Sequence, residues 1–209
     1  MRSLLKSGEP LLMAILGSDS AGSAAKALDG GADLIQVRAK ELSTQNLVRL
    51  VLEVVAKTRR PERIIVNGRP DVAMLAGCGG VHLPESGLNP RQVREAYPHL
   101  VVGVSRHDRP GLEAADRDGA DYVLLGTVGR SPGKEDSWMG LKKASGLLSG
   151  LTLPVLAVGG VDLELAAHLK LAGFRGGAAM RPFRHEREAE AAAWPLKMAL
   201  NPALKDDFS

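Results

Sequence analysis

Short apolar runs alternate with longer amphipathic segments along most of this chain. The apolar runs are rich in Val, Ile, Leu, Ala and Gly, as expected for strands buried on both faces. The predicted strands are Leu11–Gly17, Asp33–Arg38, Arg63–Asn67, Gly80–Leu83, Leu100–Ser105, Asp121–Thr127, Pro154–Val158 and Gly176–Arg181. Apolar residues at helical spacing predict helices over Ala21–Leu28, Thr44–Thr58, Pro70–Leu75, Pro90–Ala96, Gly111–Arg117, Leu141–Leu148, Leu163–Leu171 and Arg187–Leu200.

Strict alternation of strands and helices favours a parallel sheet. Eight such pairs within 209 residues predict an α/β fold of the (β/α)₈ TIM-barrel type, forming a single domain over residues 1–209. The alternative is an open, doubly wound sheet, but no G-x-G-x-x-G pattern follows the first predicted strand. Residues 202–209 are expected to be a frayed tail.

Helix ends are marked by residues suited to capping. Ser43, Asn89 and Asp162 each precede a helical pattern and are expected to act as N-caps. An internal repeat marks the opposite ends, because a glycine precedes each even-numbered strand after a short spacer. Glycine at this position ends a helix and turns the chain back into the sheet. The four glycines are Gly31, Gly77, Gly119 and Gly173.

The segment Leu153–Val161 (LPVLAVGGV) runs from an apolar strand into the glycine pair Gly159 and Gly160. Glycines at the end of a strand let backbone N–H groups approach an anion closely. An ordinary strand-to-helix turn is the alternative interpretation of this segment.

Composition narrows the class of protein. The formal net charge is only +3, Lys and Arg are scattered, and aromatic residues make up 3% of the chain, which argues against nucleic-acid binding. The apolar run Leu11–Leu16 is too short for a signal-peptide core or a membrane span. One cysteine, Cys78, excludes an internal disulfide, fits a reducing compartment and is expected to be small and buried. We therefore expect a cytoplasmic protein with no membrane partner.

In a (β/α)₈ barrel the active site lies at the C-terminal ends of the strands. Basic and amide side chains dominate the positions predicted there, and carboxylates are few. Such a site favours an anion, above all a phosphate, together with a polar heterocycle or an acid. The positions are Gln36, Arg38, Lys40, Asn67, Gly68, Arg69, His82, Pro84, Glu85, Ser105, His107, Thr127, Ser131, Lys134, Gly159, Gly160 and Arg181.

Seven segments in order resemble the thiamine phosphate synthase/TenI superfamily. They are QVRAK, IIVNGRPDVA, GVHLPESGL, VVGVSRH, GADYVLLGTVGRSPGK, PVLAVGGV and GFRGGAAM, and they cover almost the whole chain. The resemblance implies a (β/α)₈ barrel that works on the thiazole half of thiamine, with a phosphorylated thiazole as small-molecule partner. It also implies a possible homodimer.

The chain departs from the synthase branch at both magnesium ligands. Synthases read N-D-R where this chain has Asn67-Gly68-Arg69, and H-L-G-Q-x-D where it has His82 to Gly87, so both aspartates are replaced by glycine. Magnesium requires hard oxygen ligands, commonly one or two carboxylates. The T-x-T-K loop of the synthases is reduced to Ser131-Pro132-Gly133-Lys134.

The TenI-type thiazole tautomerases instead work without a metal, and the histidine of a G-x-S-x-H segment acts as acid and base. Gly103 to His107 has this pattern. A histidine suits the task because its ordinary pKa is near 6.5. The expected roles are general acid/base for His107, phosphate binding for Val158, Gly159, Gly160 and Arg181, carboxylate binding for Arg38 and Lys40, and further substrate contacts for Asn67, Ser105 and Lys134.

The leading hypothesis is thus a thiazole tautomerase, an isomerase that needs no cofactor. A thiamine phosphate synthase, a transferase that recruits magnesium through Glu85, is the first alternative. A non-catalytic thiazole phosphate-binding protein is the second. His82, at a strand end, is expected to be a hydrogen-bonded wall residue and not a catalytic one.

Overall fold

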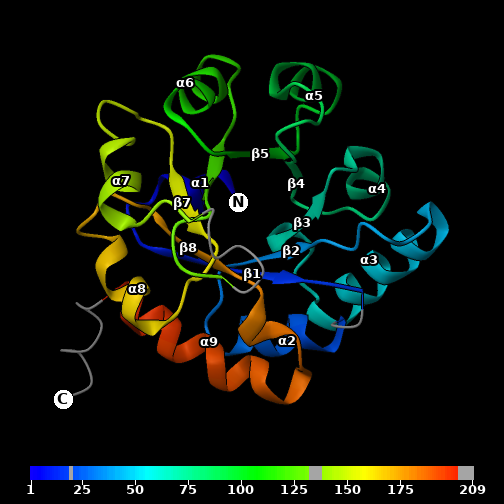
Figure 1. Ribbon diagram of the computed structural model, residues 1–209. Coiled ribbons are helices and arrows are strands. Elements are labelled where there is room, and N and C mark those ends of the chain that lie inside the picture. Colours follow the sequence, from blue (N-terminus) through cyan, green and yellow to red (C-terminus); the bar gives the residue numbers. More distant parts are fainter. Residues whose placement is uncertain (19–20, 132–137, 202–209) are drawn as a thin grey trace.

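Eight parallel strands close into a barrel in a computed structural model that describes residues 1–18, 21–131 and 138–201 (Figure 1). Each strand pairs with the next along the chain, and β1 also pairs with β8, which closes the sheet. The predicted TIM-barrel fold is therefore confirmed. The strands are β1 (Leu11–Leu16), β2 (Leu34–Val37), β3 (Ile64–Asn67), β4 (Gly80–Leu83), β5 (Val101–Arg106), β6 (Tyr122–Gly126), β7 (Val155–Val158) and β8 (Gly176–Ala179).

Helices surround the barrel and alternate with its strands (Figure 1). They are α1 (Arg2–Lys6), α2 (Ala21–Asp29), α3 (Thr44–Thr58), α4 (Pro70–Leu75), α5 (Pro90–Ala96), α6 (Arg109–Arg117), α7 (Leu141–Gly146), α8 (Leu163–Leu169) and α9 (Glu186–Leu200), with 3₁₀ turns η1 (Pro61–Arg63) and η2 (Arg181–Phe183). The three predicted N-caps are confirmed, since the side chains of Ser43, Asn89 and Asp162 accept hydrogen bonds from the N–H groups of Asn46, Arg91 and Leu165. The glycines of the internal repeat all have positive φ angles, as helix-ending glycines require.

The apolar runs are continuous because strand residues are buried on both sides. In β1, Leu11, Met13 and Ile15 point into the barrel, where they join one buried cluster. Leu12 and Leu16 point outward into the larger cluster between the barrel and its helices.

Cys78 is 6% exposed as expected, and burial raises the pKa of its thiol to about 12.

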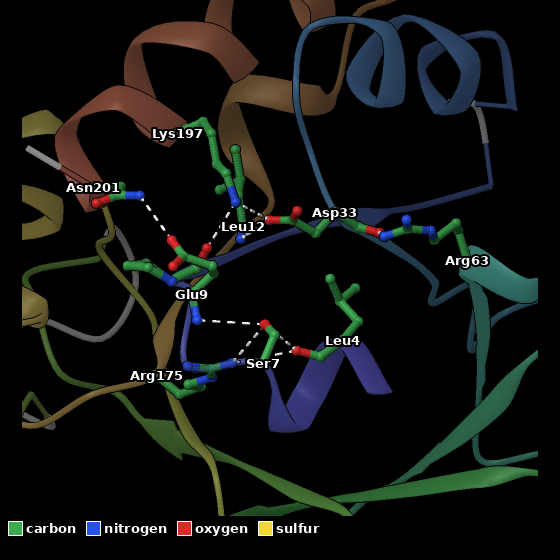
Figure 2. Close-up of polar contacts among 10 residues, drawn as sticks. Leu4, Ser7, Glu9, Leu12, Asp33, Arg63, Arg175, Lys197 and Asn201 are labelled. Atoms are coloured by element: carbon green, nitrogen blue, oxygen red, sulfur yellow. Dashed lines mark hydrogen bonds and ion pairs between the residues drawn. The ribbon is translucent and has the colours of Figure 1, made fainter. Parts of the chain in front are cut away.

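The helix α1 is an element that the apolar pattern did not predict. It lies at the N-terminal end of the barrel, where Leu5 is buried in the interior cluster. The guanidinium of Arg2 donates to Asp121 Oδ1 at 3.1 Å and to two backbone carbonyls. Arg175 donates to the carbonyl of Leu4 (Figure 2). Tertiary contacts therefore hold this short helix.

A polar network beside α1 ties the first and last elements of the chain together. Asp33 accepts hydrogen bonds from the N–H of Leu12 at 2.8 Å and from Lys197 Nζ at 2.6 Å (Figure 2). Lys197, on α9, also donates to the carbonyl of Pro10 at 2.7 Å. These contacts fix the N-terminal end of the barrel, opposite the strand ends at which a site is expected.

Two expectations need correction or fall outside the described ranges. The last strand ends at Ala179, not at Arg181, and Arg181 opens the turn η2 that leads to α9. The tail 202–209 lies outside the described residues. Within those residues, no helix is long and apolar enough to cross a membrane.

Candidate functional site

A cavity of about 790 Å³ opens at the C-terminal ends of the strands. It brings together nearly all of the side chains that the sequence placed there. Among its lining residues are Arg38, Lys40, Asn67, Ser105, His107, Val158, Gly159, Gly160 and Arg181. Arg69 is not among the lining residues, because its guanidinium is held by Asp71 and Thr44. Lys134, also predicted, lies outside the described residues.

His107 follows β5 and reaches the mouth of this cavity. Its Nδ1 contacts the carbonyl oxygen of Gly126, at the end of β6. Because a carbonyl can only accept, Nδ1 carries the hydrogen in the neutral imidazole and Nε2 has the lone pair. Nε2 lies 3.6 Å from a carboxylate oxygen of Glu85, and the His107 side chain is 52% exposed. One ring nitrogen is therefore fixed, and the other is free to exchange a proton.

The glycine pair after β7 is required by close packing as well as by backbone conformation. Gly159 and Gly160 have φ angles of 87° and 65°. A Cβ on Gly160 would lie 2.3 Å from the carbonyl oxygen of Arg130, and one on Gly159 would lie 2.5 Å from the side chain of Thr127. Larger residues cannot occupy this turn, and both glycines line the cavity, so the backbone there can approach a ligand closely.

Cationic side chains without ion-pair partners among the described residues line the same cavity. Arg38, Lys40 and Arg181 were predicted, and the cavity adds Arg130 and Arg184. Within the described part of the chain, none of the five makes an ion pair or a side-chain hydrogen bond. The guanidinium of Arg130 lies over the ring of Trp138, 5.2 Å from its centroid. Unpaired cations around a cavity favour an anionic ligand.

His82 lies deeper, at the end of β4, and is 2% exposed. Its Nδ1 is 3.0 Å from the hydroxyl of Tyr122, and its Nε2 is 2.9 Å from the hydroxyl of Ser105. Burial, followed by the charges of Arg38 and Arg106, lowers the pKa of His82 to about 3. The expectation of a hydrogen-bonded wall residue is confirmed.

Comparison with known proteins identifies the family. The family model for thiamine monophosphate synthase matches residues 13–183. The chain belongs to the thiamine phosphate synthase/TenI superfamily. It is 31% identical over 185 residues to a putative thiamine-phosphate synthase of Geobacter sulfurreducens, a match that covers 87% of each chain. It is 32% identical over 174 residues to the thiamine-phosphate synthase of Chloroflexus aurantiacus, which covers 82% of this chain and 81% of the relative.

Solved structures agree with this membership. The thiamine phosphate pyrophosphorylase of Pyrococcus furiosus superposes with a TM-score of 0.84 at 25% identity, over 97% of this chain and 98% of that one. The corresponding protein of Bacteroides thetaiotaomicron, at 16% identity, has a TM-score of 0.68 and supports the fold alone. The chain is thus a thiamine-biosynthesis barrel.

The synthases of the superfamily hold magnesium, but the donor set here does not fit it. Gly68 and Gly87 stand at the two aspartate positions and offer no side-chain oxygen. Asp71 is held by Arg69 through two hydrogen bonds of 2.9 and 2.6 Å, which lower the pKa of its carboxyl group. In the described ranges, no group of three or more His, Cys, Asp or Glu side chains is arranged to hold a metal ion. The carboxylates among the cavity-lining residues are Glu85, which faces His107, and Asp162, which caps α8.

Sequence reasoning missed Arg130 and Arg184, which line the cavity, and Tyr122, which hydrogen-bonds the lining residue His82. Arg130 and Arg184 lie in loops, where no periodic pattern marks a direction toward the cavity. Tyr122 begins β6 and reads as an ordinary apolar core residue. The signal that could have found Arg130 and Arg184 was their position, just after β6 and just after β8.

Proposed function

We propose that this barrel is a thiazole tautomerase, an isomerase that converts a carboxythiazole phosphate into its aromatic form by moving one proton. The observation that carries the proposal is His107, whose Nδ1 is tied to Gly126 and whose Nε2 faces the cavity mouth. The replacement of both magnesium-binding aspartates by glycine supports an activity that needs no divalent cation.

The substrate's phosphate is proposed to bind at the loops after β7 and β8. Backbone N–H groups between Val158 and Gly160 would donate to phosphate oxygens, and Arg181 would supply a charge-assisted contact. A guanidinium can hold two phosphate oxygens at once, which also fixes the orientation of the ligand.

The substrate's carboxylate is proposed to bind near β2, where Arg38 and Lys40 lie without ion-pair partners in the described chain. Loss of a carbon-bound proton leaves negative charge on the carboxylated ring, and these cations would stabilise it. Asn67 and Ser105 are proposed to contact the heterocycle, and Lys134 is kept as a further substrate contact.

His107 is proposed to act as both base and acid. Its Nε2 takes the proton from one carbon of the ring system, and the resulting imidazolium returns it to another carbon, so the enzyme is unchanged after each turnover. The carboxylate of Glu85, 3.6 Å from Nε2, favours the imidazolium during the time between the two transfers.

Thiamine phosphate synthesis is the second candidate function. The observation in its favour is that curated relatives of this chain are named thiamine-phosphate synthase. It would require the chain to bind magnesium through Glu85, although that carboxylate faces His107.

Product identity separates the two candidates. The protein is supplied with the carboxythiazole phosphate tautomer in chelator-treated buffer, and then with pyrimidine pyrophosphate and magnesium added. Aromatisation in the first mixture supports the tautomerase. Thiamine phosphate formed only in the second mixture, without aromatisation in the first, would overturn it. Ligand binding without either product would instead indicate a non-catalytic binding protein.

A further inference from the structure

A line of buried polar side chains crosses the barrel interior below the cavity. It joins Tyr122 on β6, His82 on β4 and Ser105 on β5 through contacts of 3.0 and 2.9 Å. Tyr122 is fully buried, and His82 and Ser105 both line the cavity, but His82 is only 2% exposed whereas Ser105 is partly exposed. Ser105 is therefore the end of the line that a ligand can reach.

Gly103 makes this line possible. An ideal Cβ at this position would lie 2.0 Å from Cζ of Tyr122 and 2.5 Å from its hydroxyl oxygen. Gly103 and Ser105 are two residues apart on β5 and point to the same side of the sheet. The missing side chain leaves the space through which the Tyr122 ring reaches His82, and the two rings lie 5.6 Å apart between centroids.

Both aromatic groups of the line remain uncharged near neutral pH. Burial lowers the pKa of His82 to about 3 and raises the pKa of the Tyr122 hydroxyl. A neutral imidazole has one N–H donor and one acceptor nitrogen, so the line has a direction that depends on the tautomer.

The buried hydroxyl of Tyr122 sets that direction. Among the described residues its hydrogen-bond contact is Nδ1 of His82 at 3.0 Å, while the amide of Gln36 on β2 donates to Met13 Sδ at 3.7 Å. A buried hydroxyl group satisfies its hydrogen by donating it, so the Tyr122 hydroxyl donates to Nδ1 of His82. The hydrogen of His82 then resides on Nε2 and is donated to the oxygen of Ser105.

We propose that Tyr122 and His82 are positioning residues that hold the Ser105 hydroxyl as a hydrogen-bond donor toward the substrate in the cavity. The identity of that substrate rests on the proposed function. In this direction each bond polarises the next, so the Ser105 hydrogen is a stronger donor than that of an isolated serine. A donor fixed in this way stabilises negative charge that develops on the carboxylated ring.

The tautomer of His82 tests the proposal without any assay of activity. In protein labelled with ¹⁵N-histidine, the resonances missing from a His82→Gln variant identify this residue. The expected spectrum at pH 7 has a protonated Nε2 and an unprotonated Nδ1. A protonated Nδ1 would overturn the proposal, because Ser105 would then donate into the barrel and not toward a ligand.

Kinetics test the coupling to Ser105. Tyr122→Phe should lower kcat about tenfold with little change in KM, since one hydrogen bond is lost and the ring shape is kept. Tyr97→Phe, at the other tyrosine of the chain, is the matched control and should match the parent. In a Ser105→Ala background, Tyr122→Phe should have no further effect. An undiminished tenfold loss in that background would assign Tyr122 a structural role only.

The two proposals fail separately. A parent protein that does not aromatise the carboxythiazole phosphate contradicts the proposed function, while an Nε2-protonated His82 still supports the line toward Ser105. A parent that aromatises its substrate with His82 protonated on Nδ1 keeps the proposed function and overturns this inference.

Discussion

The imidazole Nε2 of His107 lies 3.6 Å from a carboxylate oxygen of Glu85, and both side chains are about half exposed at the cavity mouth. Glu85 replaces the glutamine that the synthase pattern has at this position. The pair places a negative charge beside the only nitrogen of His107 that is free to exchange a proton, because Nδ1 is tied to Gly126.

Replacement of Glu85 by glutamine tests this relationship. Glu85→Gln keeps the size of the side chain and removes its charge, so the imidazolium of His107 is less stabilised during turnover. Since the pair is half exposed and screened by water, we expect kcat to fall by only about threefold to tenfold. Glu113→Gln, which breaks a surface pair with Arg109, is the control. A kcat equal to that of the parent would show that Glu85 does not assist His107.

Gly160 is expected to be intolerant of any side chain. In Gly160→Ala the new Cβ would lie 2.3 Å from the backbone oxygen of Arg130, so the loops after β6 and β7 must separate. Gly150→Ala is the control, since Gly150 also has a positive φ of 75° but has open space around it. We expect a loss of about 1 kcal/mol for Gly150→Ala and of about 2 to 4 kcal/mol for Gly160→Ala, measured by urea unfolding.

The same variants report on phosphate binding. The KM for the carboxythiazole phosphate should rise at least about tenfold in Gly160→Ala and stay at the parent value in Gly150→Ala. Equal KM values in the two variants would remove the loop after β7 from the phosphate site.

The buried His82 makes the protein sensitive to acid. Its folded-state pKa of about 3 lies below the ordinary value, so the unfolded chain takes up the proton first as the pH falls. Stability is therefore present above pH ~6.5 and is lost toward pH 3, by about 2 kcal/mol between pH 7 and pH 5. His82→Gln should lose less stability than the parent over this interval. His99→Gln, at an exposed histidine, should lose the same amount as the parent. An unchanged pH dependence in His82→Gln would contradict the burial of a neutral imidazole.

The N-terminal helix is expected to stabilise the barrel without affecting catalysis. Leu5 is 3% exposed in the interior cluster, so Leu5→Ala leaves a cavity and should lower the free energy of unfolding by about 2 to 4 kcal/mol. Leu171→Ala, at a side chain that is 89% exposed, should change it little. Since Leu5 lies at the end of the barrel opposite the site, kcat should stay at the parent value. A large loss of kcat in folded Leu5→Ala protein would contradict this separation.

The pattern of apolar runs and helix caps along the chain was sufficient to predict the barrel. Strands buried on both faces read as apolar runs, and caps such as Ser43 and Asp162 act within three residues of the chain, so both are visible in sequence. The helix α1 was not predictable, because its five residues have no period of their own. It is held by contacts such as that of Arg2 with Asp121, which lies 119 positions away.

The candidate site was predictable where residues follow a strand directly. Arg38 and His107 come just after β2 and β5, and the barrel brings such positions together. Packing between residues of neighbouring strands was not predictable. Gly103 on β5 leaves space for the ring of Tyr122 on β6. The sequence alone shows Gly103 only as part of the G-x-S-x-H pattern.

Metal-free turnover in a histidine variant tests the central claim most directly. The rate of aromatisation of the carboxythiazole phosphate is measured with chelator present for the parent, His107→Asn and the surface control His99→Asn. We predict turnover in the parent and in His99→Asn, and a loss of about a hundredfold or more in His107→Asn. Turnover in His107→Asn at the parent rate would contradict the assignment of His107 as the proton-transferring group.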